Sequence, residues 1–186
     1  DMTREVSYSR LFSQEIIELI SDKSPMILDM SISKDKFYID VEKIADQLGL
    51  KISYVDCEPE ESGSIVDNAI CVNEKHHKNR QRFTIAHEIG HYLLNHEGKN
   101  HRTNDISKYT NNQLVEERKA NDIAAQILMP KVQMEAIYIK FLEINDLDNQ
   151  DKLTLEQKDR LFDYIADKMF VSKSAASYRL LNLGIV

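Results

Sequence analysis

The sequence predicts an α+β fold that is mostly helical and carries a small three-stranded sheet. Three observations support this. β-Rich segments gather within residues 51–72, and most of the remaining chain has apolar residues at helical spacing. Hydrophobic residues make up 42% of the 186 residues, which is enough for a core. The length suits one domain with a small appendage, so we predict a domain at residues 1–148 and a helical segment at 149–186.

The predicted helices follow one another and end at recognisable stop signals. They are expected at residues 11–20, 41–48, 79–96, 113–129 and 131–143, with two or three shorter helices in 153–183. Gly49 and Gly98 follow two of these segments, as glycine often does at the end of a helix. Pro130 stops a third, because proline cannot continue the backbone hydrogen bonding.

The predicted strands cover residues 51–56, 64–66 and 69–72. The first alternates and is rich in β-forming residues. The last two flank Asp67 and Asn68, which suit a tight hairpin turn. We therefore expect a small meander sheet before the longest helices.

Charge and composition narrow the possible functions. The formal net charge is -7, from 24 basic and 31 acidic residues, which disfavours direct DNA binding as the main role. No apolar run is long enough to span a bilayer, and the first residues lack the apolar core of a secretory signal. Cys57 and Cys71 are expected to be reduced thiols. We therefore expect a cytoplasmic protein without a membrane partner.

The segment RFTIAHEIGHYLL, residues 82–94, contains the pattern H-E-x-x-H. Residues four apart share one helix face, so His87 and His91 can present ring nitrogens to one metal ion, with Glu88 beside it to orient a water. The alternative is an ordinary solvated helix. The mostly apolar surroundings favour a buried helix, and buried histidines need partners. Gly90 in mid-helix makes sense if another backbone comes close.

A catalytic zinc site needs a third protein ligand. One known pattern adds a glycine and then a third histidine beyond the second histidine. The chain has Leu94 and Glu97 at those two positions, and His96 is one residue short. That class of site is excluded, so the third ligand is expected on a later helix.

The predicted helix 113–129 places Glu117 in the middle of its apolar face, whereas the glutamate before it is nearer the border. A carboxylate in a buried stripe is costly unless a positive charge meets it. A metal dication would meet it, and so would a buried arginine such as Arg80 or Arg82. Asn121 lies on the same stripe one turn later. Its side chain is suited to accept the spare N–H of a ligand histidine.

Two motifs together resemble the ImmA/IrrE family of zinc-dependent metallopeptidases. They are RFTIAHEIGHYLLNHEG and, farther along, EERKANDIAAQILMP. The segments IDVEKIADQLGLKISYVD and AICVNEKHHKNRQ are similar to the helix, strand and hairpin that lead to the motif in that family. The tail MFVSKSAASYRLLNLGIV is similar to the family's short helix-turn-helix-like end. The resemblance covers most of the chain, apart from residues 24–38.

This resemblance implies a zincin-like metallopeptidase core with a helix-turn-helix-like C-terminal segment. It implies that His87, His91 and Glu117 are ligands of Zn²⁺ and that Glu88 is the catalytic acid and base. It also implies a protein substrate, a helix-turn-helix transcriptional repressor, in the regulation of mobile elements or stress responses.

A peptide substrate of such an enzyme would bind in an extended conformation. The strand at residues 69–72 comes shortly before the motif helix. If this strand is a sheet edge, an extended peptide can pair with it. We therefore predict Ile70 and Val72 as substrate-binding residues.

Three functions compete. The first is a zinc endopeptidase that cleaves a repressor and so relieves repression. The second is a non-cleaving anti-repressor or antitoxin-like module that acts by sequestration, and the third is a DNA-binding regulator. Glu88 favours the enzyme, because a pure binder does not need a catalytic carboxylate. The C-terminal tail offers only Lys173 and Arg179 for phosphate contacts, which counts against DNA binding.

Overall fold

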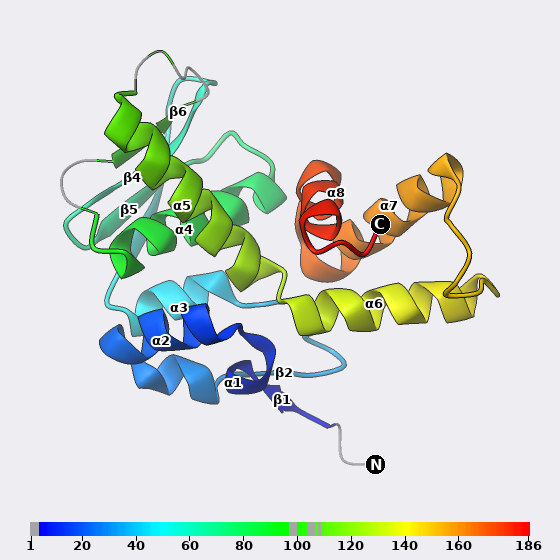
Figure 1. Ribbon diagram of the computed structural model, residues 1–186. Coiled ribbons are helices and arrows are strands. Elements are labelled where there is room, and N and C mark those ends of the chain that lie inside the picture. Colours follow the sequence, from blue (N-terminus) through cyan, green and yellow to red (C-terminus); the bar gives the residue numbers. More distant parts are fainter. Residues whose placement is uncertain (1–3, 97–99, 104–106, 108) are drawn as a thin grey trace.

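The computed structural model describes residues 4–96, 100–103, 107 and 109–186. Within these residues the α+β class is confirmed: a four-stranded sheet and a two-stranded ribbon accompany the helices. Figure 1 shows the sheet at one end of the molecule and the last two helices at another. Among the described residues, no helix combines the length and apolar character that crossing a bilayer requires.

The first part of the chain forms more and shorter secondary-structure elements than predicted. Its elements are β1 (Val6–Ser7), α1 (Tyr8–Leu11), α2 (Gln14–Lys23), the 3-10 helix η1 (Pro25–Asp29) and β2 (Ser31–Ile32). The single helix expected at residues 11–20 is replaced by α1 and α2. The side chain of Ser13 accepts a hydrogen bond from the Ile16 amide and so caps a new helix at Gln14.

The main sheet contains the three predicted strands and one more. They are β3 (Lys51–Val55), β4 (Glu61–Val66), β5 (Ala69–Asn73) and β6 (Asn100–Thr103), in the order β3-β5-β4-β6. The hairpin through Asp67 and Asn68 is confirmed, since Val66 pairs with Ala69. The expected meander is wrong, because β5 inserts between β3 and β4 and runs parallel to β3. The apolar strand β5 is thereby buried at the centre.

Ile70 and Val72 were predicted to bind substrate on the condition that strand 69–72 is a sheet edge, and the structure does not meet that condition. β5 is hydrogen-bonded to β3 on one side and to β4 on the other, so its backbone groups are already paired. Ile70 and Val72 are fully buried in the core. They do not line a substrate cleft. Among the described strands of this sheet, the outer edges belong to β3 and β6.

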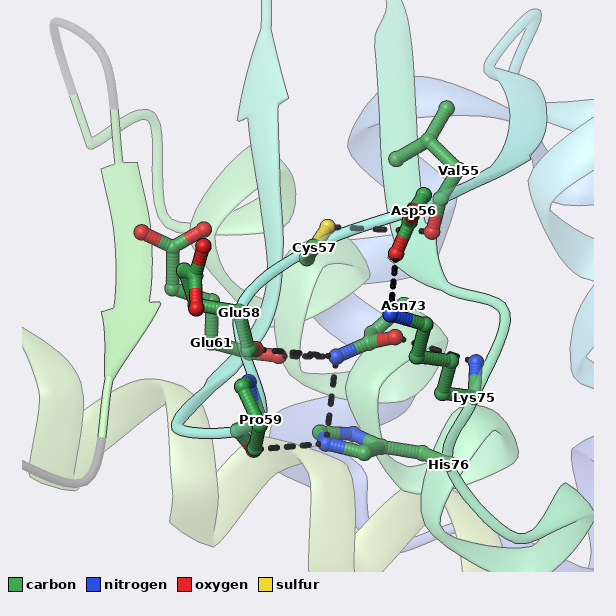
Figure 2. A network of polar contacts seen from close by, with 9 residues as sticks. All are labelled: Val55, Asp56, Cys57, Glu58, Pro59, Glu61, Asn73, Lys75 and His76. Atoms are coloured by element: carbon green, nitrogen blue, oxygen red, sulfur yellow. Dashed lines mark hydrogen bonds and ion pairs between the residues drawn. The ribbon is translucent and has the colours of Figure 1, made fainter.

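The loop between β3 and β4 is fastened to the end of β5, as Figure 2 shows. The side-chain amide of Asn73 donates to the carbonyls of Glu58, at 3.1 Å, and Glu61, at 2.8 Å. The ring of His76 lies 3.0 Å from the carbonyl of Pro59. These contacts hold the crossover loop in place, and with it the start of β4.

The remaining helices match the predicted positions. They are α3 (Val41–Gln47), α4 (Lys78–Leu93), α5 (Asn111–Leu128), α6 (Lys131–Ile144), α7 (Leu155–Met169) and α8 (Lys173–Asn182). The helix α4 ends at Leu93, earlier than predicted, because Asn95 adopts a left-handed backbone conformation with φ 55°. Helix α6 extends from the side of the molecule that holds the N-terminal helices to the side that holds α7 and α8 (Figure 1). Its connection to α7 contains the proposed boundary after residue 148.

Arg82 ties α4 to two distant parts of the chain. Its side chain is 5% exposed and donates from Nη2 to the Ile39 carbonyl at 2.9 Å and from Nε to the Phe170 carbonyl at 3.2 Å. The guanidinium also lies over the ring of Tyr38, 5.1 Å from its centroid. Burial lowers the pKa of Arg82. The planar, forked side chain thus joins the segment before α3, helix α4 and the turn before α8.

Replacing this arginine should weaken the fold even when the charge is kept. We expect Arg82→Lys to lower the free energy of unfolding by about 2–4 kcal/mol, because one ammonium group cannot reach both carbonyls. Urea unfolding followed by circular dichroism measures this. Arg160→Lys, at an exposed site of α7, is the matched control and should change stability by less than about 0.5 kcal/mol. Equal midpoints for the two variants would contradict the role given to Arg82.

Candidate metal centre

The two motif histidines lie on the buried face of α4. His87 and His91 are 0% and 1% exposed, in a helix stretch that also buries Ile85, Ala86 and Ile89. Their Nε2 atoms are 3.1 Å apart. The four-residue spacing therefore does bring two imidazole nitrogens to one point, and the helix is buried as its apolar residues predict.

Glu117, on α5, completes this cluster. Its Oε2 atom lies 2.9 Å from Nε2 of His87, and its Oε1 atom lies 2.8 Å from Nε2 of His91. The helix α5 packs along α4, which carries the carboxylate to both rings. A buried pair with arginine was the alternative, but Arg82 donates to backbone carbonyls and Arg80 donates to the hydroxyl of Ser62.

The carboxylate of Glu117 is held in its ionised form. Burial alone would raise its pKa, but hydrogen bonds from His87 and His91 outweigh burial and lower the pKa of Glu117 to about 2. At neutral pH the cluster therefore presents an anionic oxygen beside two imidazole nitrogens. This is a donor set that binds divalent cations of the zinc type.

The spacing of these atoms fits one shared metal ion. The three ligand atoms all lie within 4.8 Å of one another, and the closest approaches are 2.8 to 3.1 Å. Ligand atoms about 2.0–2.1 Å from a tetrahedral zinc ion are about 3.3 Å apart. The two imidazole nitrogens and the carboxylate are thus close enough together to share one ion. The residues therefore fit a metal ion, and the second ring nitrogen of each histidine remains available for hydrogen bonding.

Asn121 takes the place that its position on the helix predicts. Its Oδ1 atom lies 2.7 Å from Nδ1 of His87. An amide oxygen accepts from an N–H, so this contact favours the tautomer of His87 with the proton on Nδ1. With the proton on Nδ1, Nε2 can bind a metal ion once it gives up the proton that it donates to Glu117. If a metal ion binds at Nε2 of His87, Asn121 would keep the ring oriented toward it.

His96 makes the corresponding contact with His91, and sequence reasoning did not predict it. Its Nδ1 atom lies 2.8 Å from Nδ1 of His91, and one of these nitrogens carries the shared proton. Burial lowers the pKa of His96, which favours the neutral ring that can accept from His91. The sequence feature that could have indicated this contact is Asn95. Its left-handed backbone conformation turns the chain back after α4, and the His96 amide then donates to the His91 carbonyl.

Glu88 directly follows the first ligand on α4 and has no exposed surface. Its neighbours along the helix are His87 and, one turn on, His91. Glu88 is therefore close to two of the cluster residues along α4, in a part of the molecule that is shielded from water. This arrangement is suited to proton transfer beside a metal ion.

Gly90 allows α4 and α5 to approach closely, as its mid-helix position predicts. A Cβ atom there would lie 2.9 Å from the carbonyl oxygen and 3.2 Å from the Cα of Ala120. Both contacts are with backbone, which cannot rotate away. The close approach is what lets Glu117, one turn before Ala120 on α5, reach the two histidines.

Adding one methyl group at this contact should push the helices apart. We expect Gly90→Ala to lower the free energy of unfolding by about 1–3 kcal/mol, although alanine alone would favour the helix by about 1 kcal/mol. Zinc affinity should fall as well, since Glu117 moves with α5. Thermal unfolding and zinc titration measure both. Asn112→Ala, at an exposed position of α5, should leave both unchanged, and a Gly90→Ala protein as stable as the parent would refute the close-packing argument.

Comparison with known proteins agrees with this geometry. The profile of the peptidase M78 family, described as the IrrE N-terminal-like domain, matches residues 45–181. The match spans α4, α5 and the two C-terminal helices, and so includes every residue of the cluster. None of the curated proteins compared with the chain is significantly similar to it. Since the matched region makes up well over half of the chain, the protein belongs to the peptidase M78 family of IrrE N-terminal-like domains.

Proposed function

We propose that the protein is a zinc-dependent endopeptidase that cleaves a helix-turn-helix transcriptional repressor and thereby relieves repression. The observation that carries the proposal is the convergence of His87, His91 and Glu117 on one point, beside the buried Glu88. Membership in a peptidase family supports a hydrolase that acts on peptide bonds. The repressor as substrate comes from the resemblance to the ImmA/IrrE family.

In the proposed mechanism, some residues of the chain would hold the metal ion and another would transfer protons. A zinc ion bound at His87, His91 and Glu117 would supply a Lewis acid that polarises the scissile carbonyl and makes water more acidic. The carboxylate of Glu88 accepts the proton of the attacking water and passes it to the leaving amine. Asn121 and His96 keep the two rings oriented throughout, so the ligand atoms need not reorganise.

The peptide would bind as an extended chain at the edge formed by β6, in place of the central strand β5. β6 pairs with β4, where Ile65 lies opposite Asn100. A pocket of about 240 Å³ lies against this end of β4 and is lined by Ile65, Tyr92 and His96, among others. Because His96 contacts His91, this edge of the sheet is the one beside the metal cluster.

The C-terminal segment, residues 149–186, is proposed to recruit the substrate protein and not DNA. Lys173 is engaged with Asp159 at 2.7 Å and with Asp163 at 3.4 Å. An ammonium group held between two carboxylates is a poor phosphate ligand, because a phosphate would have to replace both partners. Of the two cations in the tail at residues 169–186, only Arg179 therefore remains available for a phosphate contact.

Helix α8 instead offers apolar side chains to a protein partner. Tyr178 is 66% exposed and Leu181 is 59% exposed. Exposed aromatic and aliphatic residues on one short helix are suited to a protein interface. Holding the repressor here would raise the local concentration of one exposed segment near the metal cluster.

The experiment compares a folded repressor with an unfolded protein. Zinc-loaded protein is incubated with a helix-turn-helix repressor from its own genomic neighbourhood and, separately, with unfolded casein, and fragments are mapped by mass spectrometry. We expect one cut in an exposed loop or linker of the repressor, since only a segment that is extended or opens cheaply can enter the site. Cleavage of casein at many sites, with the repressor intact, would indicate a general peptidase instead.

A further inference from the structure

A groove next to the metal cluster is lined by three arginines. It has a volume of about 630 Å³, lies between α4, α5 and α8, and is bordered by Arg80, Arg118 and Arg179. Asp122 is the one acidic residue among those that line it. On a chain with net charge -7 this concentration of positive charge is unusual. The groove is therefore complementary to an anionic group.

Arg118 and Arg179 are the two arginines of the groove on which an anionic ligand would depend most. Among the residues that the structure describes, no ion pair involves Arg118 or Arg179. Arg179 is half-buried, and its Nε donates to the carbonyl of Met129 at 2.9 Å. Burial lowers the pKa of Arg179, and Asp122 offsets this only in part. An anion in the groove would relieve the cost of keeping this guanidinium partly out of water.

The groove reaches the metal cluster through Asn121, although the cluster residues themselves are not among those that line it. Arg118 directly follows the ligand Glu117 on α5. Asn121 lines the groove and also contacts Nδ1 of His87. Phe83 lies one turn before His87 on α4 and contributes an apolar wall. One hydrogen bond, from His87 to Asn121, thus separates the groove from the metal cluster.

We infer that this groove binds an aspartate or glutamate side chain of the protein substrate, close to the peptide bond that is cut. The inference rests on the proposed peptidase function and gives it a substrate class: segments with an acidic residue near the cleavage site. The forked guanidinium groups suit a carboxylate, which can accept two parallel hydrogen bonds. The wall formed by Phe83 and Met129 suits the aliphatic part of the same side chain. A lysine or arginine at that position of the substrate would meet like charge and be rejected.

The test separates binding from cleavage by using Glu88→Gln protein loaded with zinc. The probe is a fluorescent peptide with three consecutive glutamates flanked by alanine and leucine, and its partner has glutamine in place of each glutamate. Fluorescence anisotropy gives both dissociation constants. Arg118→Glu reverses a charge that lines the groove, at an exposed site that the fold does not need. Lys119→Glu, the next residue of α5 and also exposed, makes the same change of net charge outside the groove and is the matched control.

We expect the glutamate peptide to bind about tenfold more tightly than the glutamine peptide, with the difference shrinking as salt is added. Arg118→Glu should remove this preference, and Lys119→Glu should keep it. Equal binding of the two peptides would overturn the inference, and so would equal effects of the two variants, which would indicate only long-range electrostatics. Tighter binding of a short oligothymidylate or of inorganic phosphate, lost in Arg118→Glu, would assign the groove to a phosphate ligand and overturn it too.

The same peptides distinguish this inference from the proposed function. If the parent protein prefers the glutamate peptide but does not cut it or the repressor, the peptidase proposal fails while the groove assignment stands. If the parent protein cuts the repressor but shows no preference for glutamate over glutamine, the groove assignment fails while the peptidase proposal stands.

Discussion

Glu117→Ala should remove most of the bound zinc and lower thermal stability at the same time, whereas Glu116→Ala should leave both close to the parent values. In the structure both oxygens of Glu117 face His87 and His91, at 2.9 and 2.8 Å. Without this carboxylate only the two imidazole rings remain, and they bind zinc much more weakly. Since changing a group that only supports a ligand costs about 10- to 100-fold in metal affinity, loss of a ligand should cost at least about 100-fold.

The stability effect has the same origin. Metal that binds the folded chain and not the unfolded chain stabilises the fold, by about 2.7 kcal/mol at a hundred times the dissociation constant. Zinc content by mass spectrometry and melting temperature with and without a chelator measure both effects. Chelator should lower the melting temperature of the parent and of Glu116→Ala, and leave Glu117→Ala unchanged. If Glu116→Ala and Glu117→Ala bind zinc equally well, Glu117 is not a ligand.

Glu88→Gln should abolish peptide hydrolysis while fold and metal content stay at parental levels. The amide is nearly isosteric with the carboxylate and fits the same buried position in α4, but it cannot take up the proton of the attacking water. General acid and base catalysis typically contributes about 10²- to 10⁴-fold, so the rate of repressor cleavage should fall by at least about 100-fold. Zinc content and the unfolding midpoint serve as controls for site integrity, and Glu116→Gln controls for the loss of one negative charge.

The same variant separates the two leading functions inside the cell. A reporter gene under the control of the repressor should stay repressed when Glu88→Gln protein replaces the parent. If the variant relieves repression as well as the parent does, the protein acts by sequestration, and cleavage is incidental. This outcome would favour the anti-repressor module over the enzyme.

Much of the fold and of the metal cluster could be predicted from the spacing of residues within short segments of the sequence. Helical spacing of apolar residues located α4 and α5, and the four-residue spacing of His87 and His91 put both rings on one face. The apolar stripe of α5 singled out Glu117 and Asn121, because a carboxylate there needs a positive partner. These predictions depend on which face of a single helix is buried. The periodicity of one segment contains that information.

Strand order and the positions of side chains in loops could not be predicted from the periodicity of a single segment. The pattern of β5 predicts a buried strand but does not say which strands flank it, since the order β3-β5-β4-β6 depends on pairing between distant segments. Ile70 and Val72 were misplaced at an edge for this reason. His96 gained its contact with His91 through the left-handed turn at Asn95, just beyond the helical repeat.

The sequence by itself therefore determined the fold class, the helices from α3 onward and the set of residues that meet as a candidate metal site. Each of these follows from short-range periodicity and from the cost of burying charge in one helix face. The tertiary structure alone decided how those helices cross, with Gly90 against Ala120 setting the distance between α4 and α5. It alone brought Arg80, Arg118 and Arg179 into one groove from three helices. Such groupings join residues that are far apart in the chain, and only packing in three dimensions places them together.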